Sequence, residues 1–249
     1  MPGFFKQIHT LINEADIILE IVDARFADKT RNKQIEEVII QKGKTLIIAI
    51  NKSDLVTKQE IAKAKSELIK STKSRVVFVS AKEKNGIRLL KREIGIAKGS
   101  KKELIIGLLG YPNAGKSTII NGLSGKGMGK VKTSPKAGYT RGLQRIKIAE
   151  GIYLIDAPGI IPYDERDEFK LFIFGAKNPN QLKDIESAGF KLVEALKDRI
   201  KTVFEVEGED EEEILEAIGK KKKMFAKGGK VDLIKTARFV LEKYQKNEL

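Results

Sequence analysis

Residues 104–124 combine a short apolar run, a glycine-rich turn and a helical segment. The run Leu104–Leu109 predicts a buried strand, and residues 110–117, GYPNAGKS, match the pattern G-x-x-x-x-G-K-S/T in full. In this order of strand, turn and helix, backbone N–H groups turn inward on a phosphate and the helix N-terminus adds its dipole. We therefore predict a nucleotide site; the alternative is a glycine-rich turn that binds nothing. The expected contact residues are Tyr111, Pro112, Asn113, Ala114, Gly115, Lys116, Ser117 and Thr118.

Apolar runs alternate with helical patterns along the first two thirds of the chain. Strands are expected at 17–22, 45–50, 75–79, 104–109, 142–149 and 152–155. Helices are expected at 2–15, 31–41, 58–71, 87–97 and 116–124. This alternation predicts an α/β fold with a mostly parallel sheet and right-handed crossovers. Every candidate motif follows a strand, so the motifs should meet at the carboxyl edge of the sheet.

From residue 162 onward the apolar residues recur at helical spacing instead. We predict two domains, a nucleotide-binding domain at 1–161 and a small α-helical domain at 162–249. Residues 203–206 fit a strand or a helix end equally well. An acidic run at 209–213 and a basic run at 220–223 are interpreted as solvated faces.

Composition narrows the class of protein. There are no cysteines, which excludes disulfides and thiolate zinc sites and fits a cytoplasmic protein. No apolar run approaches the roughly 20 residues of a membrane span, and we expect no secretory leader. The formal net charge is +14, and residues 1–161 carry 30 basic against 15 acidic side chains. This excess indicates a polyanionic partner.

The basic excess is strongest at residues 124–149, where seven bases have no acidic neighbour within the segment. They are Lys126, Lys130, Lys132, Lys136, Arg141, Arg145 and Lys147. We interpret the segment as a nucleic-acid contact; a solvated basic surface is the alternative.

Two short motifs after predicted strands indicate which nucleotide is bound. In Asn51-Lys52-x-Asp54, a carboxylate can accept from guanine N1–H and the N2 amine together, whereas adenine offers no such donor pair. The stem of Lys52 can cover the base, and the amide of Asn51 can tie neighbouring loops together. In Ser80-Ala81-Lys82, a backbone N–H near Ala81 can donate to guanine O6. The two motifs together predict guanine specificity.

A third motif and the glycine-rich turn supply the expected metal and phosphate contacts. Lys116 should reach the β- and γ-phosphates, and Ser117 should ligate Mg²⁺. In Asp156-x-x-Gly159, the carboxylate should lie near Mg²⁺, with a water between them, and the Gly159 N–H should donate to the γ-phosphate. A bound Mg²⁺ and a nucleoside triphosphate are therefore expected.

The segments GYPNAGKS, DAPG, NKSD and SAK resemble the guanine-nucleotide motifs of P-loop GTPases, but their order differs. Moving residues 104–161 ahead of 17–97 restores the usual order, so the resemblance implies a circular permutation. With VDAR at 22–25, the chain resembles the YlqF/RbgA-like ribosome-assembly GTPases. The likeness extends weakly to the C-terminal GGKVDLIKTARFVLEKY.

The resemblance implies further roles. Thr140 matches the switch I threonine that ligates Mg²⁺, and Asn113 matches a phosphate-loop asparagine that holds K⁺ in related potassium-activated enzymes. Ile160 stands where Ras-like enzymes have a water-orienting glutamine. The family's histidine after Pro-Gly is replaced by Phe4, and His9 does not match it. The catalytic set is therefore limited to Lys116, Thr140 and Gly159.

These features predict a slow GTPase, stimulated by K⁺ and by a ribosomal particle, that acts in assembly of the large ribosomal subunit. Its partners would be a ribosomal subunit or precursor and rRNA, with no membrane partner. The alternative is an RNA-binding scaffold protein that holds guanine nucleotide structurally, with negligible turnover. A membrane-trafficking GTPase fits poorly, because the chain has no terminal lipidation motif.

Overall fold

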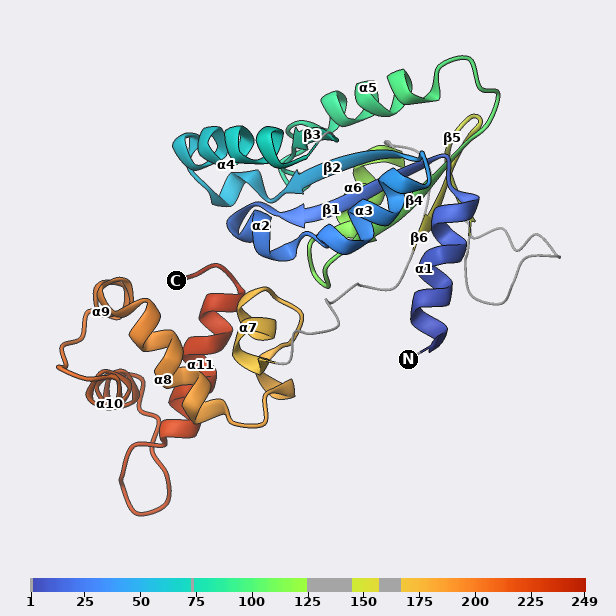
Figure 1. Cartoon of the computed structure of the whole chain (residues 1–249). Helices are drawn as coiled ribbons and strands as arrows, with labels where there is room; N and C mark the ends of the chain where they lie inside the picture. Colours follow the sequence, from blue (N-terminus) through green and yellow to red (C-terminus); the bar gives the residue numbers. More distant parts are fainter. Residues whose placement is uncertain (1, 73, 125–144, 157–166) are drawn as a thin grey trace. The chain divides into compact units, whose positions relative to one another are not determined.

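A computed structural model describes residues 2–72, 74–124, 145–156 and 167–249 (Figure 1). The chain divides into two compact units, Met1–Tyr163 and Asp164–Leu249. The domain boundary expected after residue 161 falls outside the described residues and stays a prediction.

The first unit is built on a six-stranded sheet with the order β3-β2-β1-β4-β6-β5. All neighbouring pairs are parallel except β5 with β6, which are antiparallel at the edge. The prediction of an α/β fold with a mostly parallel sheet is confirmed. The strands are β1 (Ile17–Asp23), β2 (Thr45–Asn51), β3 (Arg75–Phe78), β4 (Leu104–Gly110), β5 (Arg145–Ala149) and β6 (Ile152–Asp156).

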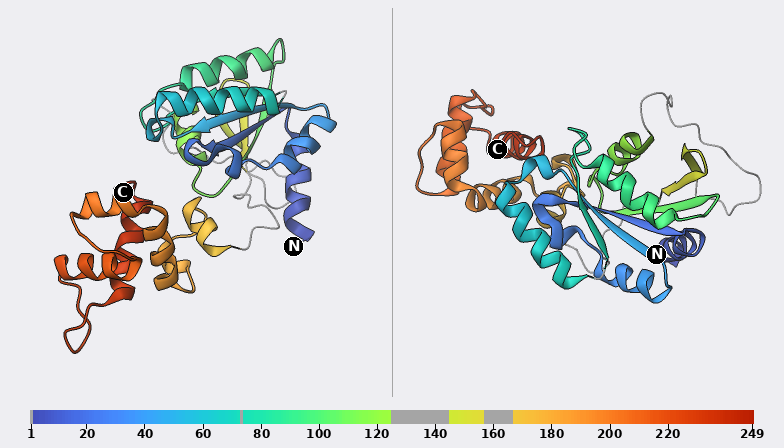
Figure 2. Two further views of the ribbon diagram at one scale, coloured as in Figure 1. Left: turned by 60° about the vertical axis from the view of Figure 1, so that its left-hand side comes forward. Right: turned by 90° about the horizontal axis from the view of Figure 1, so that it is seen from above.

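Helices cover both faces of this sheet (Figures 1 and 2). On one face, α1, α3 and α4 form a core with alternate strand residues such as Ile18 and Ile48. The intervening residues, such as Leu19 and Ile47, are also buried and belong to the other face, where α5 and α6 contact the sheet. The helices of this unit are α1 (Pro2–Glu14), α2 (Ala27–Thr30), α3 (Lys33–Gln41), α4 (Lys58–Ser71), α5 (Ile87–Lys98) and α6 (Lys116–Ser124).

Because both faces are covered, the central strands are almost continuously apolar. Strand β1, IILEIVD, is buried at every position. Its exceptions to apolar character are Glu20 and Asp23, and both carboxylates find polar partners.

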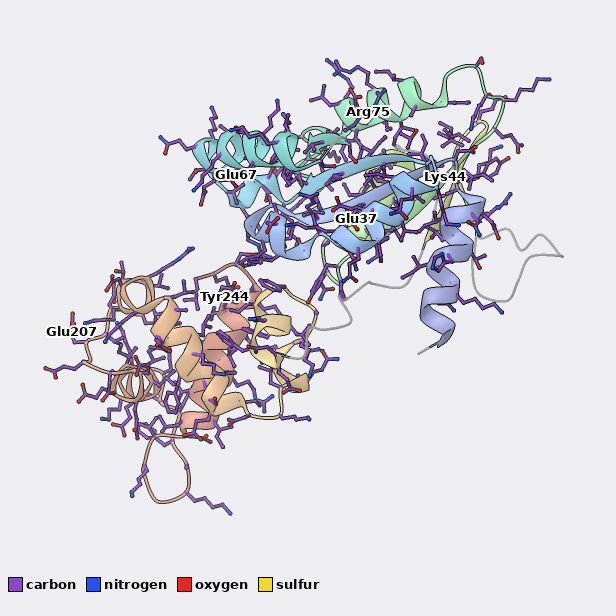
Figure 3. All side chains as sticks on the ribbon, in the orientation of Figure 1. Glu37, Lys44, Glu67, Arg75, Glu207 and Tyr244 are labelled. Atoms are coloured by element: carbon purple, nitrogen blue, oxygen red, sulfur yellow. The ribbon has the colours of Figure 1, made fainter. Side chains whose placement is uncertain are left out.

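The second unit is α-helical. Its core packs Leu192 and Val193 of α8 against Ile214 of α10 and Leu241 of α11. The ring of Tyr244, which is labelled in Figure 3, lies against Phe172. The two ring centroids are 5.7 Å apart. The helices are α7 (Glu168–Ile173), α8 (Ile185–Ala195), α9 (Lys197–Phe204), α10 (Glu211–Lys221) and α11 (Leu233–Gln245).

The ambiguous residues 203–206 form a helix end. Helix α9 stops at Phe204 because Glu205 adopts a left-handed conformation with φ 50°. No helix in the described part of the chain is long and apolar enough to cross a membrane.

Candidate nucleotide-binding site

The glycine-rich turn lies between the end of β4 and the start of α6, as predicted. A Cβ added to Gly115, which has φ +98°, would lie 2.2 Å from Asn51 Nδ2. A Cβ on Gly110 would lie 2.5 Å from the carbonyl oxygen of Ile21. Only glycine fits these two positions, because strand β1 and the Asn51 amide approach the loop backbone so closely.

The side chain of Lys116 turns back over this loop from the first turn of α6. Its Nζ donates to the carbonyl oxygens of Gly110 at 3.1 Å and Tyr111 at 3.4 Å. Ser117 is exposed beside it, and Asn113, which is also exposed, adopts φ 58°. The ammonium group thus lies where the loop backbone turns, which is the place expected for bound phosphates.

Asn51 joins the glycine-rich turn to the loop that follows β3. This side chain is 3% exposed; its Nδ2 donates to the Ala114 carbonyl at 2.9 Å, and its Oδ1 accepts from the Ala81 N–H at 3.1 Å. The amide therefore acts as a buried clamp between two loops from distant parts of the sequence. The N–H of Ala81, which we expected to donate to guanine O6, is engaged by Asn51, so binding O6 would require it to be shared.

The loops after β2 and β3 are also joined through their backbones. The Ser53 N–H donates to the Val79 carbonyl at 3.1 Å. Ser80 is buried, and its Oγ accepts from the Glu83 N–H at 3.2 Å, closing the turn that carries exposed Lys82. Asp54 lies in a single 3-10 turn, Ser53–Leu55, and is exposed beside this pair of loops.

Asp23 was not singled out as a site residue from the sequence, yet it holds Lys52 in place. It is 1% exposed at the end of β1 and pairs in register with Asn51 of β2. Its Oδ2 accepts from Lys52 Nζ at 2.8 Å and from Arg25 Nη2 at 2.7 Å. Lys52 itself adopts the left-handed conformation, φ 64°. The available signal was an acidic residue ending the strand next to the NKSD strand.

Charge explains why Asp23 stays ionised in this position. Burial alone would raise its pKa, but the hydrogen bonds and positive charges of Arg25 and Lys52 hold the pKa below its usual range. The guanidinium of Arg25 also lies over the Phe26 ring, 5.4 Å from its centroid.

The remaining predicted site residues are only partly described. Strand β6 ends at Asp156, which pairs with Leu108 of β4, so this residue lies at the same edge of the sheet as the glycine-rich turn. Thr140, Gly159 and Ile160 lie outside the described residues, as do all bases of the basic segment except Arg145 and Lys147. The structure brings the loops after β1, β2, β3 and β4 together at the carboxyl edge.

Comparison with known proteins agrees with this arrangement. Residues 5–165 match the family model described as RsgA GTPase, and residues 105–227 match the model described as 50S ribosome-binding GTPase. The chain is similar over 97% of its length to the GDP-bound structure of a YlqF protein, with a TM-score of 0.68 and 23% identity, and covers 95% of that chain. Because the two sequences are only 23% identical, this similarity is evidence for a shared fold.

Three curated relatives each match 98% of the chain. An uncharacterized GTP-binding protein of Methanocaldococcus jannaschii, MJ1464, is 38% identical, and 65% of its length is covered. Nucleolar GTP-binding protein 2 of Neurospora crassa is 31% identical with 40% covered, and nuclear/nucleolar GTPase 2 of Arabidopsis thaliana is 29% identical with 43% covered. The chain therefore spans about two fifths to two thirds of the length of these relatives.

Proposed function

This chain belongs to the YlqF-like family of circularly permuted ribosome-binding GTPases, as its motifs predicted, and from this premise we propose that it is a GTP-hydrolysing switch in ribosome assembly. The observation that best supports nucleotide binding is the Asn51 clamp, which joins the glycine-rich turn to the SAK loop. The clamp brings the proposed phosphate site and the proposed base site into one place.

Phosphates would bind to backbone N–H groups of residues 110–117 other than Pro112, with Lys116 turning from the loop carbonyls to the β- and γ-phosphates. Mg²⁺ fits this edge of the sheet, because a hydroxyl on Ser117 and a carboxylate on Asp156 are hard oxygen ligands and lie on neighbouring segments. From the resemblance, we add Thr140 as a metal ligand and Gly159 as a γ-phosphate donor. When bound, the metal would neutralise charge that develops on the phosphates.

Guanine would be recognised by the exposed carboxylate of Asp54, with the Lys52 stem covering the base. Asp54→Asn should lose GTP affinity and gain relative affinity for xanthosine triphosphate, because xanthine presents an oxygen where guanine presents its N2 amine. Competition binding among GTP, ATP and xanthosine triphosphate tests this assignment. Tight ATP binding by the unmodified chain would contradict it.

Catalysis would need a group that this chain does not supply at position 160, since an aliphatic side chain cannot orient water. We propose that K⁺, held in part by Asn113, and a ribosomal particle supply it. Turnover should rise when Na⁺ is replaced by K⁺ at equal ionic strength, and Asn113→Ala should flatten this response. Nucleotide affinity of that variant is the control, and it should stay close to the unmodified value.

The proposed partner is the large ribosomal subunit or its precursor, contacted through rRNA by the basic segment at 124–149. Cytoplasmic localisation remains a prediction. The decisive experiment measures GTP hydrolysis with and without purified ribosomal subunits, in K⁺ and in Na⁺, with Lys116→Ala as the inactive control. Stimulated turnover is expected.

Ile160 favours one second candidate, a guanine-nucleotide-binding scaffold protein on RNA with negligible turnover. If the chain is such a scaffold protein, it should bind nucleotide and ribosomal subunits. Its GTP hydrolysis should then stay at the level of Lys116→Ala with and without subunits, in K⁺ and in Na⁺.

A further inference from the structure

The connection between α10 and α11 forms a compact hairpin that projects from the second unit (Figure 1). We call residues 222–232 the lysine hairpin. Phe225 and Val231 form an antiparallel bridge, and the Ala226 N–H donates to the Lys230 carbonyl at 2.8 Å. The Asp232 N–H donates to the Met224 carbonyl at 2.9 Å. The backbone of this connection therefore has a defined conformation.

The base of the hairpin is packed tightly against the helices. A Cβ on Gly219 of α10 would lie 2.3 Å from Val231 Cγ1, so this helix and the hairpin touch directly. Thr236 is fully buried and donates to the Asp232 carbonyl at 2.9 Å. Asp232 in turn caps α11 by accepting from the Lys235 N–H at 2.9 Å. The base of the hairpin is thus anchored to both α10 and α11.

The lysine hairpin carries more positive charge than is needed to stabilise the C-terminal end of α10. Residues 220–231 include six lysines and no acidic residue. Lys220 and Lys221 end α10, where positive charge is favourable, and pair with Glu216 and Glu205, each at 2.8 Å. Lys223, Lys227 and Lys230 lie beyond the helix, are exposed, and form no ion pair with the residues that the structure describes. Their mutual repulsion favours a polyanionic partner.

An aromatic ring lies among these lysines. Phe225 is 47% exposed, whereas the other phenylalanine and tyrosine side chains whose exposure the structure describes are at least partly buried. Most other aromatic rings of this unit contribute to its interior, as Phe172 and Phe204 do. An exposed ring surrounded by lysines suits single-stranded nucleic acid, whose bases stack on aromatic faces while its phosphates meet the cations.

We propose that the lysine hairpin is a second RNA contact, in which Phe225 stacks on an unpaired base while Lys223, Lys227 and Lys230 contact phosphates. The choice of RNA among polyanions rests on the proposed function in ribosome assembly. In the sequence this site is separate from the basic segment at 124–149, and it includes Lys223 of the run at 220–223, whose pattern alone indicates a solvated face.

Stacking is tested with a fluorescently labelled single-stranded RNA of about 12 nucleotides and its duplex, titrated with the full chain. Phe225→Ala should weaken single-strand binding roughly fivefold to a hundredfold, the usual range for losing one stacked base. The duplex should be affected much less. Val203→Ala is the matched control, because Val203 of α9 is 48% exposed in the same unit. Equal single-strand affinity of Phe225→Ala and the unmodified chain would overturn the proposal.

Phe225→Trp is both a rescue variant and a reporter, because the chain contains no other tryptophan. It should retain affinity, and its fluorescence should be quenched by single-stranded RNA but not by heparin, which has charge and no bases. Quenching by heparin or by anionic phosphatidylserine vesicles to the same extent would reject base stacking and favour a general polyanion or membrane contact.

The phosphate contacts are tested through salt dependence. The logarithm of the binding constant for single-stranded RNA falls linearly with the logarithm of the salt concentration. Replacing Lys227 and Lys230 together by serine should reduce the magnitude of this slope by about 1.4, since each single-strand phosphate contact contributes about 0.7. Lys246→Ser, which removes an exposed charge from the end of α11, should change it far less. If Lys246→Ser lowered the slope as much, the hairpin would contribute only to the net charge of the chain, and the proposal would be wrong. GTP binding and subunit-stimulated turnover, measured in parallel, would still report on the proposed function.

Discussion

Asp23 and Glu20 are buried three residues apart on β1, and their surroundings push their pKa values in opposite directions. Asp23 faces two cations, Arg25 and Lys52, which keep its pKa low despite burial. For Glu20, burial raises the pKa to about 8, and the neighbouring Glu36 carboxylate adds to the rise. The number of cations for each carboxylate decides which one stays ionised at neutral pH.

Asp23 with its two cations, and Glu20 with Arg31 and Glu36, form two clusters that have different structural roles. The Asp23 cluster lies at the carboxyl edge, where an ionised carboxylate can hold Lys52 over the proposed base site. The Glu20 cluster lies inside the unit: Arg31 forms a two-fold hydrogen bond to Glu36 at 2.7 and 2.6 Å, and Glu20 accepts from the Asn32 N–H at 2.8 Å. A proton on Glu20 relieves repulsion between two carboxylates that share one guanidinium. The first cluster positions Lys52, a proposed ligand contact, and the second joins the 31–36 segment to the sheet.

The largest effect is expected from Arg31→Met. Its side chain is 2% exposed, so its removal leaves the Glu36 carboxylate buried beside Glu20 without a cation. Such uncompensated burial should lower the free energy of unfolding by about 3–5 kcal/mol. Denaturant unfolding at pH 7 measures it.

The matched control for Arg31→Met is Arg25→Met, because Asp23 keeps Lys52 and the Arg25 side chain is 20% exposed. It should destabilise the chain clearly less. Similar losses in the two variants would show that the two clusters do not differ as their partners suggest.

The next largest effect is expected on the pH dependence of folding stability. The pKa of Glu20 is about 8 in the folded chain against an ordinary value of 4.5, so the folded state keeps a proton that the unfolded chain releases. The stability contribution is complete below the ordinary value and is lost as pH rises toward 8, by up to about 1.4 kcal/mol per pH unit. Asp23 has the opposite sign, and its contribution is lost only in acid.

Glu20→Gln should flatten the decline in stability between pH 6 and 8.5, because the amide is neutral throughout. Thermal unfolding of both chains across this range provides the measurement. Parallel curves for the two chains would mean that Glu20 is ionised in the folded state.

These clusters also mark what the sequence could predict. Apolar runs and the glycine-rich turn were sufficient to place the strands, α6 and the loops at the carboxyl edge, because these signals are local. Glu20 breaks an apolar run, but its surroundings come from Asn32 and Glu36, which the sequence does not place beside it. The antiparallel direction of β5 and the short helix α2 were likewise unpredicted, because tertiary contacts decide them.

A smaller effect is expected from Asp23→Asn, and it should appear in binding. Without the carboxylate, Lys52 Nζ loses its 2.8 Å anchor and its stem is less well placed over the base. Affinity for GDP should fall about tenfold, equivalent to about 1.4 kcal/mol. Asp28→Asn, which breaks an exposed ion pair with Lys33, is the control and should leave affinity unchanged. Unchanged affinity in Asp23→Asn would separate this cluster from the nucleotide site.

The smallest effect is expected from Thr30→Val, at the point where the clusters meet. Thr30 is 3% exposed; its Oγ1 accepts from the Asp23 N–H at 3.1 Å and donates to the Phe26 carbonyl at 3.0 Å. Valine keeps the shape but loses both hydrogen bonds, which should cost about 1 kcal/mol of stability. If Thr30 also fixes the position of Asp23, a double-mutant cycle with Asp23→Asn on GDP affinity should give a non-zero coupling energy. Additive effects would mean that Arg25 and Lys52 alone position the carboxylate, and that the two clusters act independently although they share a strand.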